Sequence, residues 1–355
     1  MYTEEELNLI TVCSIENISY LNAASIYREL GGKLPAFIKI DEQLIKSAPR
    51  GVYNKVKGKF FDREYRECIL KEYESKGIKC VTVLSKDYPE NLKHIPSPPL
   101  VLFCKGNIQL LNTDCFAVVG SRRTAANILK ECKNFSGQLT RHFTVVTGAA
   151  DGADSMAIEG AIDSGKLICV LAYGFNYYYP AMNEALIKKV EKKGLLITEY
   201  PPKVQPHKYQ FPVRNRIIAG LCLGTLIVSA GETSGAAITA NCALDYDRQV
   251  FAFPYSLGVA SGSGCNALIK KGAQLTDNIL DIFLSFGLDF KQSEQVQLTE
   301  EEFKVYGLVK QDGETFAGDL AAKLNKKSNE IIVLLSMLEI KGKVRRLGGN
   351  RFAAL

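Results

Sequence analysis

The chain has 355 residues, of which 46% are hydrophobic and 23% are charged, so it can bury a sizeable core and is not globally disordered. At about 100–200 residues per domain, this length predicts two or three domains. The 44 Lys and Arg residues exceed the 38 Asp and Glu residues, which gives a formal net charge of +6. This mild excess permits a polyanionic partner without requiring one.

The ten cysteines and three histidines argue against a metal centre. No pair of cysteines has the Cys-x-x-Cys spacing, and His94, His142 and His207 lie far apart. Most of the cysteines stand in apolar runs, which is typical of buried thiols in a reducing compartment. The acidic start MYTEEELNLI does not resemble a signal peptide, and no run of about 20 apolar residues occurs. We therefore predict a cytoplasmic protein with no membrane segment, metal or cofactor.

Residues 1–77 have the apolar periodicity of helices. The segments EEELNLITVCSI and NAASIYREL each place apolar residues three and four positions apart. We expect Asn22 to cap the second of these helices and Gly31 and Gly32 to end it. The pattern predicts a small helical module, of the sterile-alpha-motif or helix-hairpin-helix type.

Within the predicted core domain, residues 78–285, a Pro-rich entry is followed from about residue 112 by short apolar strands that alternate with segments of helical periodicity. The principal predicted strands cover residues 115–120, 143–148, 167–174, 195–200, 225–231 and 249–254. Nearly continuous apolar strands separated by helices predict an α/β core with a Rossmann-like, doubly wound and mostly parallel sheet. Such a sheet binds its ligand beyond the carboxyl ends of the strands, where Gly120, Gly148, Gly174 and Gly231 fall.

A polar stretch at residues 286–297 predicts a linker, and residues 298–355 form a further module. Thr299 and Glu302 have the spacing of a capping box, and two more helical segments follow. Gly348, Gly349 and Asn350 then mark the turn of a terminal hairpin. Three helices followed by a hairpin predict a winged helix-turn-helix.

The turn after the first core strand contains Gly120, Ser121 and Arg122, a combination that suits anion binding at a helix N-terminus. The alternative is an ordinary helix cap with a solvated arginine. A P-loop-like spacing at residues 160–167 lacks the Ser or Thr that would hold Mg²⁺. It also follows a helix rather than a strand, so Gly165 is better explained as a helix C-cap.

A second polar cluster, Arg214, Asn215 and Arg216, precedes a strongly apolar run and suits phosphate clamping. The alternative for this cluster is a structural network of ion pairs. Ser234 and Gly235 open a helix after another strand, again with the geometry of an anion nest. Several such turns at one edge of the sheet would form a continuous polar groove.

The motifs VVGSRR, TGAADGAD, ITEYPP, FPVRNRIIAGL and SGAAITANCAL, in this order, resemble the DNA-processing protein A family (DprA, or Smf) over about residues 80–285. The resemblance implies a non-enzymatic protein that binds single-stranded DNA, protects incoming DNA in natural transformation and loads the RecA recombinase. It also implies a homodimer. The residues that it implies for DNA binding are Gly120, Ser121, Arg122, Arg214, Asn215, Arg216, Ser234, Gly235 and Thr239, with Lys208 near them.

The chain departs from the family pattern at five positions. Asp151 stands at a usually basic position, Ala153 replaces an isoleucine, Ile158 replaces a histidine, Ser229 replaces a glutamate and Tyr255 replaces a glycine. These departures put the DNA contact at the turn containing Asp151 in doubt. Two other functions stay open: a nucleotide-hydrolysing enzyme of the LOG type using Glu232, and a transcription regulator acting through residues 298–355.

Overall fold

The computed structural model describes residues 2–16, 18–38, 49–231, 234–288 and 298–354. The chain divides into two compact units, Met1–Phe286 and Gly287–Leu355. The predicted helical module and the predicted sheet domain both belong to the first unit. Most of the predicted linker, residues 289–297, lies outside the described residues.

The N-terminal helices are α1 (Glu4–Cys13), α2 (Tyr20–Glu29), α4 (Arg50–Phe60) and α5 (Arg63–Ser75). Thr3 begins α1 with a capping box to Glu6. The prediction that Asn22 caps α2 is wrong, because Ser19 is the cap and accepts the backbone N–H of Asn22. The serine hydroxyl reaches the third helical N–H from the extended residue before the helix, which Asn22, inside the helix, cannot do.

The first unit is built on one nine-stranded sheet, in the order β1-β2-β6-β5-β4-β3-β7-β8-β9. Its strands are β1 (Lys79–Thr82), β2 (Val101–Gly106), β3 (Cys115–Val119), β4 (Thr144–Thr147), β5 (Leu167–Val170), β6 (Leu195–Thr198), β7 (Gly224–Ile227), β8 (Gln249–Ala252) and β9 (Gln274–Leu275). The pairs β1–β2 and β2–β6 are antiparallel, and every other pair is parallel. The doubly wound, mostly parallel sheet predicted from the sequence is therefore confirmed.

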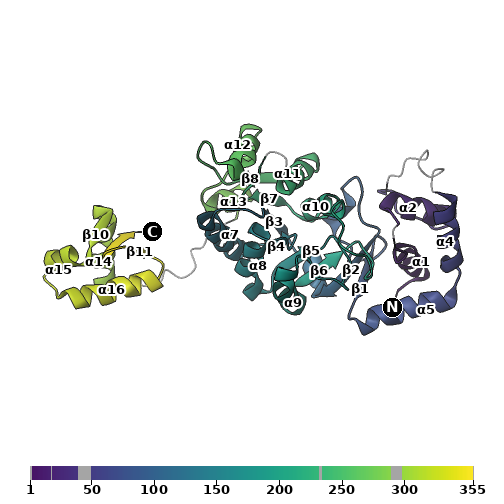
Figure 1. The fold of residues 1–355 in the computed structure, drawn as a ribbon, viewed down its shortest axis with the longest axis horizontal. Coiled ribbons are helices and arrows are strands. Elements are labelled where there is room, and N and C mark those ends of the chain that lie inside the picture. Colours follow the sequence, from purple (N-terminus) through teal and green to yellow (C-terminus); the bar gives the residue numbers. More distant parts are fainter. Residues whose placement is uncertain (1, 17, 39–48, 232–233, 289–297, 355) are drawn as a thin grey trace. The chain divides into compact units, whose positions relative to one another are not determined.

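Helices cover both faces of this sheet (Figure 1). Its helices are α6 (Glu90–Lys93), α7 (Ala126–Leu139), α8 (Ala153–Ala161), α9 (Glu184–Lys193), α10 (Gln210–Leu221), α11 (Gly235–Asp245), α12 (Ser263–Lys270) and α13 (Ile279–Ser285). Helix α8 packs between α7 and α9 on one face, and α10 packs on α11 at the other. Right-handed crossovers place the helices in this way when the strand order reverses. Strands β3 to β7 are buried along their whole length, as expected for a sheet covered on both sides.

The second unit contains α14 (Glu300–Asp312), α15 (Ala317–Leu324) and α16 (Ser328–Ile340), with β10 (Glu314–Phe316), β11 (Val344–Leu347) and β12 (Arg351–Ala354). The predicted capping box of Thr299 and Glu302 begins α14, and the predicted hairpin joins β11 to β12. The short strand β10, which was not predicted, pairs with β12. This unit has its own core, which includes Val305, Leu320, Leu335 and Phe352. The winged-helix assignment stays a prediction.

Candidate nucleic-acid interface

The strand order reverses between β3 and β7, which are neighbours in the sheet. From β3 the chain winds through α7 toward β4, and from β7 it winds through α11 toward β8 on the other side. The carboxyl ends of these two strands are therefore the switch point, the place at which doubly wound proteins bind ligands. We call this region, residues 120–125, 228–231 and 234–235, the switch-point edge.

The turn after β3 is fastened to the end of β7 by hydrogen bonds. The backbone N–H of Ser121 donates to Oγ of Ser229 at 2.9 Å. The hydroxyls of Thr124 and Ser229 share a hydrogen bond of 2.6 Å. A Cβ at Gly120 would lie 2.5 Å from Cγ2 of Val228, so only glycine fits there. Ser229, one of the departures from the family pattern, is thus a fully buried anchor of the turn.

The turn after β4 lies against the same edge. The backbone N–H of Ala153 donates to the carbonyl of Ser121 at 3.3 Å. Gly152 has φ +79°, and a Cβ there would lie 2.6 Å from the carbonyl oxygen of Arg122. Asp151, at the usually basic position, is partly exposed and its carboxylate accepts the N–H of Gly152 at 2.8 Å. This turn therefore adds negative charge at the switch-point edge.

The backbone amides of this edge already hold an anion from the chain itself. Asp154 is 5% exposed, and its carboxylate accepts the N–H of Ala150 at 3.2 Å. Burial raises the pKa of Asp154, while the charge of Arg214 and the N–H groups of Gly120 and Gly148 oppose that rise. Because the carboxylate occupies these donors, a ligand phosphate must be held by side chains that project from the edge.

Arg214 lies beneath the edge and does not project from it. It is 4% exposed, and its Nη1 donates to the carbonyls of Gly148, at 2.7 Å, and Val170. Burial lowers the pKa of its guanidinium, and the carboxylate of Asp154 opposes that shift. Arg214 therefore joins the carboxyl ends of β4 and β5 and neutralises the buried carboxylate.

Arg216 belongs to a different side of α10. Two residues along a helix correspond to about 200° of rotation, so Arg214 and Arg216 point in different directions. The guanidinium of Arg216 forms a two-pronged ion pair with Glu199, at 3.1 and 2.7 Å. Both side chains are nearly buried, with 11% and 12% exposed. Arg216 therefore belongs to a structural ion pair, which was the alternative to phosphate clamping for this polar cluster.

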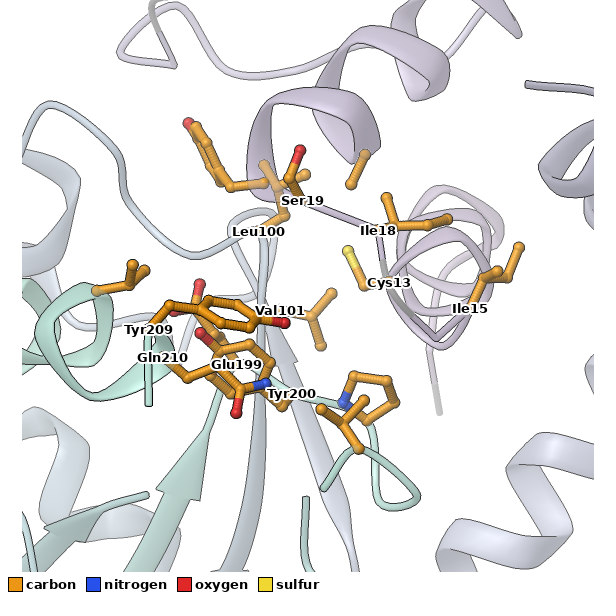
Figure 2. A pocket seen from close by; sticks show the side chains of 15 residues that line it. Cys13, Ile15, Ile18, Ser19, Leu100, Val101, Glu199, Tyr200, Tyr209 and Gln210 are labelled. Carbon is orange, nitrogen blue, oxygen red and sulfur yellow. The ribbon is translucent and has the colours of Figure 1, made fainter. Parts of the chain in front are cut away.

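A cavity of about 370 Å³ lies on this side of α10, between the N-terminal helices and the sheet. Figure 2 shows Glu199, Tyr200 and Tyr209 on one side of it, and Cys13 and Ile18 on the other. Arg216 therefore lies next to this cavity through its ion pair with Glu199. None of the switch-point residues lines it.

The remaining predicted residues join α10 to the start of α11. Nδ2 of Asn215 donates to the carbonyl of Gly235 at 3.0 Å. Ser234 caps α11 by accepting the N–H of Ala237 at 3.3 Å. Thr239 is 2% exposed and donates back to the carbonyl of Gly235. Of these residues Gly235 is exposed, Ser234 is half-buried, and Asn215 and Thr239 are buried, so Asn215 and Thr239 position the start of the helix.

The exposed groups at the edge are two arginines, and a half-buried aromatic side chain lies beside one of them. Arg122 and Arg123 are exposed, and within the described chain neither has an ion pair. The guanidinium of Arg122 lies 5.9 Å from the ring centre of Phe211, which contacts Tyr179 at 5.5 Å. The sequence analysis did not include Arg123 and Phe211 among the site residues. Their signals were the second arginine of GSRR and the aromatic residue that opens FPVRNR.

Other site chemistries find little support in the described part of the chain. No group of three or more His, Cys, Asp or Glu residues there could hold a metal ion. No helix among those residues is long and apolar enough to cross a membrane. Glu232, the acid on which the nucleotide-hydrolysing alternative depends, lies outside the described residues.

These features define a Rossmann-like protein with two exposed arginines and a half-buried aromatic ring at the switch point of its sheet. The model of the family "DNA recombination-mediator protein A" matches residues 79–287. The chain belongs to this family, which confirms the resemblance noted in its motifs.

Relatives of known name agree with this assignment. The chain is 38% identical to DNA processing protein DprA of Bacillus subtilis over 218 residues, covering 61% of this chain and 73% of that protein. It is 36% identical to protein Smf of Escherichia coli over 233 residues, covering 64% and 62%.

Two solved structures are also similar. DprA of Streptococcus pneumoniae has a TM-score of 0.67 at 29% identity and covers 81% of this chain and 99% of its own. DNA processing protein A of Helicobacter pylori, described for its single-stranded DNA binding mode, has a TM-score of 0.55 at 27% identity, covering 59% and 95%.

Proposed function

We propose that this protein binds single-stranded DNA at the switch-point edge, protects incoming DNA during natural transformation and delivers it to the RecA recombinase. The observation that carries this proposal is the pair Arg122 and Arg123, exposed and without ion pairs in the described chain, with Arg122 beside the ring of Phe211. Family membership and the single-stranded DNA binding of the Helicobacter pylori relative support it.

The chemistry of this edge suits a single strand better than a duplex. Guanidinium groups neutralise phosphates, and an accessible ring stacks on an unpaired base, which a duplex does not offer. We propose that the protein acts by binding and not by catalysis. Its three histidines are dispersed in sequence, and its buried carboxylate, Asp154, is held by Arg214 and backbone amides.

Competition between oligo-dT and a duplex of equal length tests the DNA specificity, with fluorescence anisotropy as the readout. We expect the single strand to bind more tightly, and the variant Arg122→Gln/Arg123→Gln to lose affinity for it. The matched control, Lys189→Gln/Lys192→Gln, removes two exposed charges from α9, outside the switch-point edge. A stronger affinity for duplex, or equal losses in both variants, would contradict the proposal.

Delivery to RecA and self-association are further parts of the proposal. Exposed apolar side chains on two adjoining elements, Leu275 of β9 and Leu284 of α13, support a homodimer because they are large and not covered within the described chain. We expect a dimer by light scattering, which Leu284→Glu should convert to monomer.

RecA should assemble faster on single-stranded DNA coated with single-strand-binding protein when this protein is added. An unchanged assembly rate would contradict the delivery role.

A further inference from the structure

Helix α4 carries four cations and no acid. In the sequence RGVYNKVKGKF these are Arg50, Lys55, Lys57 and Lys59. Within the described chain none of them has an ion pair, whereas α5, the next helix, carries charges of both signs. Like charges three or four residues apart on a helix repel each other, so this composition costs stability. A helix with such a charge pattern is suited to an anionic partner.

The cations of α4 form two separate groups. One group alternates with aromatic rings along a single stripe: Arg50, Tyr53, Lys57 and Phe61 follow one another at spacings of three, four and four residues. The Nζ of Lys57 lies 5.9 Å from the ring centre of Tyr53, which confirms that these neighbours meet. We call these four residues the α4 stripe.

Phe61 is the most unusual member of the stripe. Its side chain is 66% exposed, although the preceding Phe60 is buried and contacts it edge-on at 5.0 Å. Val56 and Phe60 provide the apolar contacts of α4 with the rest of the unit. Phe61 therefore contributes a largely accessible ring one helical turn from Lys57, away from the face of the helix that Val56 and Phe60 bury.

The other two cations have a different environment. Lys55 and Lys59 line a cavity of about 200 Å³ together with Lys203. Glu16 and Glu72 line the same cavity, and Glu72 is already within 3.5 Å of Lys203. Lys59 also lies 4.5 Å from the ring centre of Tyr65. Two carboxylates partly offset the three lysines on this flank, so it is a less favourable place for a phosphodiester chain.

We propose that the α4 stripe is a second contact surface for single-stranded DNA, separate from the switch-point edge. The inference rests on the proposed function, because it assumes that this protein binds single strands. Arg50 and Lys57 neutralise phosphates, while Phe61 and Tyr53 stack on unpaired bases. Alternation of cations with rings is the arrangement that binds single strands without reading their sequence.

The position of α4 makes the contact depend on the length of the DNA. The N-terminal helices lie beside the β1–β2 end of the sheet, whereas β3 and β7 are near its middle (Figure 1). We expect an oligonucleotide of about 6 nucleotides, within the range of a single binding site, to fill the switch-point edge alone. A strand of about 30 nucleotides reaches both surfaces.

The experiment uses the full chain and two oligo-dT lengths, about 6 and about 30 nucleotides, with anisotropy as the readout. Phe61→Leu should weaken binding of the long strand by about tenfold, as expected for loss of one stacked base, and leave the short strand unchanged. Phe61→Tyr keeps the ring and should bind like the parent. Melting temperatures verify that the variants fold. Because Phe61 is largely exposed, its substitutions should leave the melting temperature unchanged.

A salt titration tests the cations of the stripe. Arg50→Gln/Lys57→Gln should reduce the slope of log affinity against log salt by about 1.4 for the long strand, since each single-strand phosphate contact contributes about 0.7. Lys55→Gln/Lys59→Gln makes the same charge change on the opposite flank of α4 and should have little effect.

Three outcomes would overturn this inference. The first is an equal change in salt slope in Arg50→Gln/Lys57→Gln and Lys55→Gln/Lys59→Gln. The second is an affinity for the long strand that Phe61→Leu leaves unchanged. The third is a loss of affinity in Phe61→Leu that is the same for the short and the long strand. Binding of the short strand separates this failure from that of the proposed function. If the short strand binds and depends on Arg122, the switch-point edge is functional whatever happens at α4.

Discussion

Replacing Arg214 by alanine should destabilise the fold before it affects any DNA contact. The guanidinium is 4% exposed, donates to two backbone carbonyls and faces the buried carboxylate of Asp154. Removing it takes away the positive charge that acts on that carboxylate and leaves the carbonyls of Gly148 and Val170 without this donor. Leaving a buried hydrogen-bonding group unsatisfied costs about 1–3 kcal/mol. We expect Arg214→Ala to lower the free energy of unfolding by that amount.

The structure also predicts how the loss of stability in Arg214→Ala depends on pH. Without Arg214, burial raises the folded-state pKa of Asp154 above its unfolded value with no positive charge to oppose it. A carboxyl group of this kind favours the folded state at low pH, and that contribution is lost as pH rises through the folded pKa. The gap in stability between Arg214→Ala and the parent should therefore narrow on acidification. Asp154→Asn, which removes the charge and keeps an acceptor, should recover part of the loss.

Urea denaturation of the full chain, followed by circular dichroism at several pH values, measures these differences. The control is Arg122→Ala, an exposed substitution that should change stability by less than about 0.5 kcal/mol. If Arg214→Ala unfolds like the parent and instead loses affinity for oligo-dT, Arg214 contacts DNA and our view of it as a buried clamp is wrong.

Three further predictions concern the turns and the N-terminal helices. Gly152→Ala should cost about 1–3 kcal/mol, because φ is +79° and the new methyl would lie 2.6 Å from the carbonyl oxygen of Arg122; unchanged urea denaturation would refute this. Ser229→Ala removes the acceptor of the Ser121 N–H and should cost about 1 kcal/mol and weaken DNA binding, with Ser229→Thr as the conservative comparison. Burial raises the pKa of Glu6, but hydrogen bonds from nearby hydroxyl and amide groups hold it below its usual value. The ionised Glu6 therefore stabilises the fold above its unfolded-state pKa, and this contribution is lost as pH falls through its folded-state pKa. In Glu6→Gln the free energy of unfolding should fall less steeply on acidification than in the parent.

The sheet could be predicted because its signal is local. Runs such as CFAVVG and LICVLAYG are apolar throughout and end at glycine, which identifies buried parallel strands without knowledge of their neighbours. Gly165, predicted as a C-cap, has φ +73° and ends a short 3₁₀ helix. The strands β9 and β10 have only two and three residues, too few to show any alternation.

The roles of the arginines could not be predicted to the same extent. The sequence places Arg214 and Arg216 in one polar cluster, but burial and partners depend on residues far along the chain. Asp154 lies 60 positions before Arg214, and Glu199 lies 17 before Arg216. The formal charge of +6 counts both arginines as available, whereas Arg214 is buried on backbone carbonyls and Arg216 is paired with Glu199. The exposed cations of the site are instead Arg122 and Arg123, in a turn fixed by Ser229.

A salt titration of oligo-dT binding to the parent and to Arg122→Gln/Arg123→Gln tests the central claim most directly. If both arginines neutralise phosphates at the switch-point edge, the slope of log affinity against log salt should fall by about 1.4 in the variant. Lys189→Gln/Lys192→Gln, with the same change in net charge, should keep the parent slope. An Arg122→Gln/Arg123→Gln slope equal to that of the parent would contradict the assignment of single-stranded DNA binding to this edge.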